Sequence, residues 1–205
     1  MKAIILAAGE GTRLRPLTLE VPKAMVEIFG KPLLAHNMDK LLSHVDEFTI
    51  VVKYKEEIVR EYFGKSYKGI PIKYHTQKDK KGTAGALEGI NIKGDCFILA
   101  SDAIFYQSDI DRLMGLQGYG VLAKQVADPQ KYGIFQINTY NILQKVIEKP
   151  QENIGNLASL FYFKVNSEII RYTEKIKKSE RGEYELTDAL NLFVAKYEVF
   201  VQEIQ

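Results

Sequence analysis

The sequence predicts an α/β fold: a mostly parallel mixed sheet with helices on both faces and a short β meander over the ligand edge. Three observations support this prediction. Apolar, strand-like runs alternate with helical periodicity from residue 3 to residue 100, and a glycine-rich loop follows the first run. Residues 121–165 contain instead short strand candidates separated by turn signals. The alternating order is Rossmann-like and implies that successive strands lie parallel.

The first half of the chain supplies the parallel strands and their connecting helices. The predicted elements are, in order, a strand over 3–8, a helix from Pro32, a strand over 48–52, a helix over 55–63, a strand over 70–76, a helix over 83–91 and a strand over 96–100. Ligands of such sheets bind at the carboxyl ends of the strands, where the glycine-rich loop lies.

Shorter elements follow in the second half. The predicted elements are strands over 121–126, 134–137, 143–147 and 160–165, a helix to about residue 178, a helix over 186–196 and a closing strand over 199–201. We find no internal repeat or linker, so residues 1–205 are expected to form a single domain.

Composition excludes several classes of function. The net charge is +2, and 46% hydrophobic and 26% charged residues are ordinary values for a soluble globular protein. Positive charges form no long block, which argues against binding to nucleic acid or a membrane surface. No apolar run is long enough to cross a membrane, and Met1-Lys2 leads directly into a strand, so a cytoplasmic location is expected.

Residues 6–25, LAAGEGTRLRPLTLEVPKAM, contain the strongest functional signal. Gly9 and Gly11 allow backbone N–H groups to close around phosphate oxygens, and Arg13 and Lys23 match the charge of a polyphosphate. The loop lacks the Gly-Lys-Ser/Thr of a P-loop and the third glycine of a dinucleotide-binding loop. It therefore predicts a site for a triphosphate.

Six ordered segments between residues 6 and 188 resemble one family, the nucleoside-triphosphate:sugar-1-phosphate nucleotidylyltransferases. The segments are residues 6–25, Gln77 with Gly82-Thr83-Ala84-Gly85, Ser101-Asp102, Tyr132-Gly133, Glu148-Lys149-Pro150 and the run from Gly182 to Asp188. This resemblance implies that a nucleoside monophosphate passes from an NTP to a sugar-1-phosphate, with release of pyrophosphate. The two substrates are the expected partners, and the chain is expected to be a monomer or a homo-oligomer.

The resemblance also implies roles for individual residues. Arg13 and Lys23 are the expected catalytic cations, and Asp102 is the expected ligand of Mg²⁺. From its position alone, Asp102 could equally cap a helix. The expected nucleotide-binding residues are Leu6, Ala8, Gly9, Gly11, Thr12, Gln77, Gly82 and Thr83. The expected sugar-phosphate-binding residues are Gly133, Glu148, Lys149, Asn156 and Glu183. A glutamine at position 77 followed by Gly-Thr favours uracil or thymine, hence UTP or dTTP.

The sequence departs from the family pattern at three places. Ser101 replaces the glycine before the metal aspartate, and Leu157-Ala158-Ser159 replaces an Asn-Ala-Gly segment. The family's second metal ligand would lie beyond residue 205. These departures motivate one alternative, a catalytically degenerate nucleotide-sugar sensor or partner subunit. A second alternative is a cytidylyltransferase that acts on a phosphoalcohol such as phosphocholine.

Overall fold

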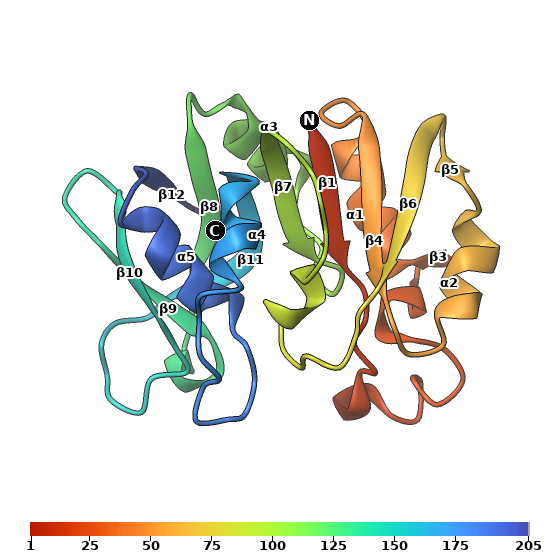
Figure 1. Ribbon diagram of the computed structural model, residues 1–205, viewed down its shortest axis with the longest axis horizontal. Coiled ribbons are helices and arrows are strands. Elements are labelled where there is room, and N and C mark those ends of the chain that lie inside the picture. Colours follow the sequence, from red (N-terminus) through yellow and green to blue (C-terminus); the bar gives the residue numbers. More distant parts are fainter. Residues whose placement is uncertain (205) are drawn as a thin grey trace.

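A mixed ten-stranded sheet runs through the computed structural model, which describes residues 1–204 (Figure 1). Its main path has the order β10-β9-β11-β7-β1-β4-β6-β5, and β8 pairs with both β11 and β12. The strands are β1 (Lys2–Leu6), β4 (Glu47–Val52), β5 (Ser66–Tyr67), β6 (Ile70–Thr76), β7 (Asp95–Ala100), β8 (Tyr119–Gln125), β9 (Gly133–Ile137), β10 (Leu143–Glu148), β11 (Leu157–Asn166) and β12 (Val199–Glu203). A separate hairpin consists of β2 (Glu27–Ile28) and β3 (Lys31–Pro32).

The strands predicted for the first half form the parallel part of this sheet. β1 lies between β4 and β7 and runs parallel to both, so Ala3 is level with Phe48 on one side and Phe97 on the other. β6 runs parallel to β4 beyond it. The side chains of Ala3, Phe48 and Phe97 are fully buried, as expected for strands covered on both faces. The prediction of a mostly parallel central sheet is confirmed.

Antiparallel pairing dominates the second half. β11 runs antiparallel to β7, β8 and β9, and β10 runs antiparallel to β9. The predicted meander therefore continues the same sheet beside its ligand edge. Gly133, at the start of β9, is level with Glu148, at the end of β10. This places two residues predicted to bind the sugar phosphate at one end of the meander.

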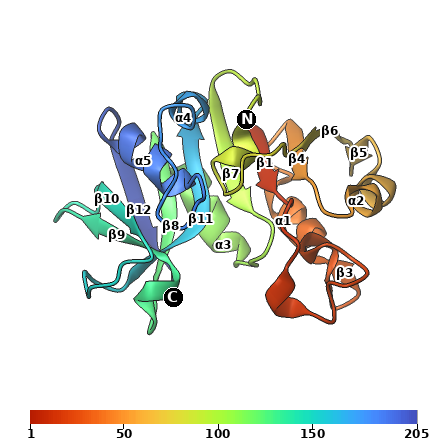
Figure 2. The ribbon, with the colours of Figure 1, turned by 60° about the horizontal axis from the view of Figure 1, so that its bottom comes forward.

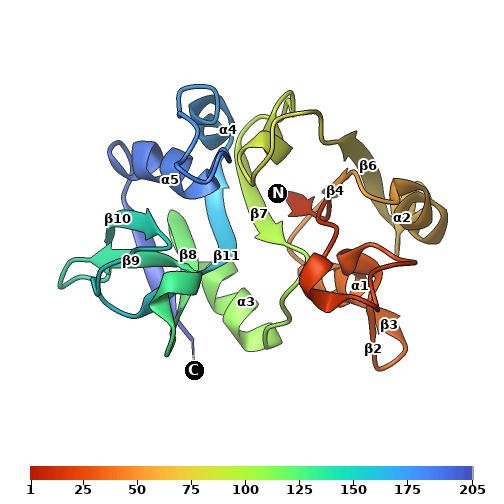
Figure 3. The ribbon, with the colours of Figure 1, turned by 90° about the horizontal axis from the view of Figure 1, so that it is seen from below.

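Helices cover both faces of the sheet, as predicted (Figure 2, Figure 3). On one face, α1, α2 and α3 pack in the same core as Ala3 and Ile5 of β1. On the other face, α4 and α5 pack in the same core as Ile4. The helices are α1 (Leu33–Leu41), α2 (Glu56–Phe63), α3 (Gln107–Gly115), α4 (Glu168–Tyr172) and α5 (Leu186–Val194). No helix within residues 1–204 is long and apolar enough to cross a membrane.

The helix predicted over 83–91 is wrong, since only Gly85–Leu87 form a single 3₁₀ turn, η3. A Cβ atom on Gly85 would lie 2.3 Å from the carbonyl oxygen of Lys80, so this chain segment doubles back on itself. The preceding residues are bonded to a distant loop, with the Ala84 N–H donating to the Tyr184 carbonyl at 2.9 Å. Helical periodicity contained no trace of that long-range contact.

One further helix prediction is wrong, and one helix was not predicted. The helix predicted to reach residue 178 ends at Tyr172, and residues 173–184 instead run back toward the loop at 81–84. Conversely, the sequence did not reveal α3, which buries only Asp109, Ile110 and Leu113. Its short apolar stripe gives a weak periodic signal.

Candidate functional site

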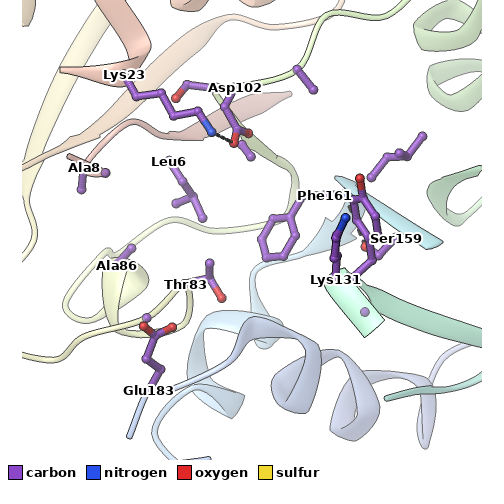
Figure 4. A pocket seen from close by; sticks show the side chains of 18 of the residues that line it. Leu6, Ala8, Lys23, Thr83, Ala86, Asp102, Lys131, Ser159, Phe161 and Glu183 are labelled. Carbon is purple, nitrogen blue, oxygen red and sulfur yellow. Dashed lines mark hydrogen bonds and ion pairs between the residues drawn. The ribbon is translucent and has the colours of Figure 1, made fainter. Parts of the chain in front are cut away.

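A cavity of about 850 Å³ opens at the carboxyl ends of β1 and β7. The start of β9 and the end of β10 also line it. Most of the residues that the sequence predicted for the site line it (Figure 4). These residues are Leu6, Ala8, Gly9, Arg13, Lys23, Gln77, Gly82, Thr83, Asp102, Gly133, Glu148 and Glu183. The fold thus brings together the predicted cations, the predicted metal carboxylate and residues predicted for both substrates.

Four predicted residues, Gly11, Thr12, Lys149 and Asn156, do not line the cavity. Gly11 packs against Lys23 within the loop: its φ is +67°, and a Cβ atom there would lie 2.8 Å from Cβ of Lys23. Thr12 is exposed at the start of the 3₁₀ turn η1 (Thr12–Leu14). Lys149 donates its backbone N–H to the Tyr132 carbonyl at 2.9 Å. Asn156 is exposed, and its backbone carbonyl accepts the Val126 N–H at 3.0 Å.

The glycine-rich loop is held by the side chain of Thr18, a few residues further along the chain. The Thr18 hydroxyl donates to the Gly11 carbonyl at 2.8 Å, and Thr18 is buried. Lys23 then opens the 3₁₀ turn η2 (Lys23–Met25), whose Ala24 and Met25 are buried in the core. The side chain of Lys23 therefore projects into the cavity from an anchored backbone.

Lys23 and Asp102 form an ion pair at the phosphate side of the cavity. Lys23 Nζ donates to Asp102 Oδ2 at 2.5 Å (Figure 4). Asp102 follows β7, and the preceding Ser101 bonds on both sides, its N–H to the Leu6 carbonyl and its carbonyl to the buried Asn37 side chain. The backbone that carries the carboxylate is therefore fixed between β1 and α1.

Gln77 follows β6 and lines the cavity, where its side-chain oxygen is the polar atom left for a ligand. Its Nε2 donates to the Lys80 carbonyl at 2.9 Å and to the Gly82 carbonyl at 3.2 Å. Both amide hydrogens are thereby used within the loop. Only the side-chain oxygen remains to bind a ligand, and it can only accept.

Thr83 and Glu183 lie close together because two loops join there (Figure 4). Tyr184 donates its N–H to the Lys81 carbonyl, and the Thr83 hydroxyl accepts the Leu186 N–H at 2.9 Å. At Gly82, a Cβ atom would lie 2.4 Å from the Tyr184 carbonyl oxygen, so only glycine fits. This contact explains why Gly82 and residues 183–186 belong to one site although a hundred positions separate them.

Carboxylates gather on the sugar side of the cavity. Arg181 lies between Glu148, Glu183 and Glu185, with N–O distances of 3.6, 3.6 and 3.2 Å. Burial, and secondarily the charge of Glu185, raises the pKa of the Glu148 carboxyl. Burial likewise raises the pKa of Glu185. Arg181 holds these groups in place by offsetting part of their repulsion.

Several residues that line the cavity were not among the site residues predicted from the sequence, and Lys131, Ser159 and Phe161 are three of them. Lys131 lines the sugar side and pairs with Asp128 at 2.7 Å. Ser159 and Phe161 line the same wall from β11. The departure of Leu157-Ala158-Ser159 from the family pattern was the available signal for this wall. Within residues 1–204, no three His, Cys, Asp or Glu side chains gather in a group that could hold a metal.

Comparisons with known proteins agree with this geometry. The family model "Nucleotidyl transferase" matches residues 2–205. A bifunctional sugar-1-phosphate nucleotidylyltransferase/acetyltransferase of Sulfurisphaera tokodaii is 38% identical over 100% of this chain, which spans only 51% of that relative. UTP--glucose-1-phosphate uridylyltransferase AglF of Haloferax volcanii is 35% identical, over 95% of this chain and 84% of its own. The crystal structure of a UDP-glucose pyrophosphorylase complexed with UDP-glucose shares the fold, with a TM-score of 0.86, 23% identity and coverage of 100% and 90%.

Proposed function

This chain belongs to the nucleotidyl transferase family, and from that premise we propose that it transfers a nucleoside monophosphate from an NTP to a sugar-1-phosphate. One observation carries the proposal. The Lys23–Asp102 pair lies in one cavity together with Gln77, on the side predicted for the nucleotide, and Glu148, on the side predicted for the sugar. A group bound on each side would meet the other where the charges are concentrated.

The cations suit the chemistry of this transfer. A sugar phosphate oxygen is already ionised near neutral pH, so the nucleophile needs no general base. The protein must instead bring two anions together and stabilise the charge that develops on the α-phosphate and on the leaving pyrophosphate. We assign Arg13 to the outer phosphates and Lys23 to the point where the two substrates meet.

Gln77 supports UTP or dTTP as the nucleotide. Its free side-chain oxygen can accept a hydrogen bond from N3–H of uracil or thymine, whereas N3 of cytosine carries no hydrogen. The name of the Haloferax volcanii relative also specifies UTP.

Mg²⁺ is the proposed cofactor, and Asp102 is its proposed ligand. The carboxylate is a hard oxygen donor at the phosphate side of the cavity, and it forms an ion pair with the ammonium of Lys23. One carboxylate fits an ion that takes most of its ligands from phosphates and water. The bound ion would neutralise phosphate charge and orient the α-phosphate. The released Lys23 ammonium would then be available to the substrates.

On the sugar side, Glu148 and Glu183 are proposed to accept hydrogen bonds from sugar hydroxyls, and the backbone of Gly133 leaves room beside them. A Cβ atom on Gly133 would lie 3.0 Å from Glu148 Oε2. The reaction consumes a nucleoside triphosphate, which fits the cytoplasmic location expected from the sequence.

Pyrophosphate release across a panel of NTPs and sugar-1-phosphates, with Mg²⁺, tests the proposal. We expect turnover with UTP or dTTP and loss of turnover in Asp102→Ala. Tight nucleotide-sugar binding by calorimetry without turnover in any combination would contradict the proposal and support a sensor. Turnover only with CTP and a phosphoalcohol would support the second alternative instead.

A further inference from the structure

Phe161 has a backbone conformation that aromatic residues rarely adopt. Its φ is +59°, in the left-handed region, although it lies inside strand β11. A bulky residue there is an outlier that the surrounding structure must enforce. Strained residues of this kind cluster at sites where the strain positions a side chain for function.

The pairing of β11 with its neighbours explains how Phe161 is held in this conformation. The register of β11 with β8 is regular up to Ser159, which faces Ala123, and resumes at Phe163 after an irregularity. On the other edge, Tyr162 is level with Leu99 of β7. Phe161 therefore lies in a bulge between two anchored stretches. The Ser159 hydroxyl accepts the Phe161 N–H at 3.3 Å, which bonds this backbone group inside the bulge.

The bulge determines where the aromatic ring lies. Figure 4 shows the Phe161 ring projecting into the cavity, on the side that faces Leu6 and Thr83. The ring centroids of Phe161 and the buried Phe163 are 5.0 Å apart, so the two rings pack against each other. Phe161 and the neighbouring Leu160 add apolar surface to the lining of the cavity.

We propose that Phe161 is a specificity-determining residue, and that its ring is the platform on which the pyranose ring of the sugar-1-phosphate packs. This inference rests on the proposed function. A pyranose has faces of C–H groups and a rim of hydroxyls. The C–H face suits an aromatic ring, while Glu148 and Glu183, which line the same cavity, suit the hydroxyls. Strain in β11 is thus used to keep the platform in place before the sugar arrives.

Steady-state kinetics of Phe161→Leu, Phe161→Gly and Phe161→Tyr test this inference, using the substrate pair that turns over fastest in the panel. We expect KM for the sugar-1-phosphate to rise about tenfold or more in the Leu and Gly variants, with KM for the NTP nearly unchanged. Phe161→Tyr keeps the ring and should retain the wild-type KM. Tyr140→Leu, which removes an exposed aromatic outside the cavity, is the matched control.

Thermal melting of the same variants separates this role from a purely structural one. Glycine adopts φ +59° without strain, so Phe161→Gly should melt above Phe161→Leu while binding the sugar as poorly. If the wild-type protein is active and Phe161→Leu and Phe161→Gly keep the wild-type KM for the sugar-1-phosphate, the inference about Phe161 fails while the proposed function stands. The inference also fails if KM for both substrates rises equally. If the wild-type protein uses no sugar-1-phosphate, the proposed function fails and the inference falls with it.

Discussion

The two sides of the cavity are built in different ways. The nucleotide side follows the parallel strands, and its glycine-rich loop is held by a near neighbour, because the Thr18 hydroxyl bonds to the Gly11 carbonyl. The sugar side draws on β9, β10, β11 and the loop before α5. Its geometry depends on contacts between residues far apart in the chain, such as Arg181 with Glu148.

This difference shows how each half reaches a fixed geometry. Backbone hydrogen bonds and glycines preorganise the nucleotide side at little electrostatic cost. On the sugar side, buried like charges and a strained aromatic residue are held by surrounding structure. Substitutions on the two sides should therefore differ in size and kind.

The largest expected effect is that of Lys23→Met. Because this change removes positive charge where the phosphates of both substrates meet, kcat should fall about 10²–10³-fold. Pyrophosphate release measures this loss, with Lys93→Met, at an exposed lysine before β7, as the control. A decrease no larger than that of the control would contradict the assignment of Lys23 to transition-state stabilisation.

The next effect concerns the choice of base. In Gln77→Ala the acceptor for N3–H is lost, so the preference for UTP over CTP in kcat/KM should fall about 10–100-fold. KM for the sugar-1-phosphate should stay near its wild-type value, since Gln77 lies on the side predicted for the nucleotide. Gln144→Ala, on the exposed side of β10, serves as the control. Unchanged base preference would show that another group reads the base.

Gly11→Ala should act on stability. Alanine at φ +67° is strained by about 1–2 kcal/mol, and its Cβ would also meet the Lys23 side chain. Gly30→Ala is a matched control, because φ is +73° there and a Cβ would have open space. Chemical denaturation should show a greater loss of unfolding free energy for Gly11→Ala. Equal losses would indicate that the packing of Lys23 on the loop contributes little.

The smallest expected effect is a pH dependence on the sugar side. Burial raises the pKa of Glu148 above its ordinary 4.5, so its ionisation is less favourable in the folded state. Ionisation therefore costs stability as the pH rises from about 4.5 through the raised pKa. Glu148→Gln lacks this cost, and its Tm relative to wild type should increase over that pH window and then level off. A constant or falling difference would contradict the raised pKa.

Much of the fold was predictable because its signals are local. Apolar runs with covered faces identified β1, β4, β6 and β7, and the loop at 9–13 followed directly from its glycines and cations. The helix over 83–91 failed because long-range bonds to Tyr184 override its periodicity. α3 was missed because its apolar stripe is short.

The sequence by itself determined the central strands, the phosphate loop and the candidate side chains Arg13, Lys23, Gln77, Asp102 and Glu148, since residue type and spacing encode these features. Only the tertiary structure decided how the side chains are used. It paired Lys23 with Asp102, bonded the amide hydrogens of Gln77 to the Lys80 and Gly82 carbonyls and placed the Phe161 ring in the cavity. These outcomes depend on strand register and on contacts across the sheet, which arise only when distant segments pack together.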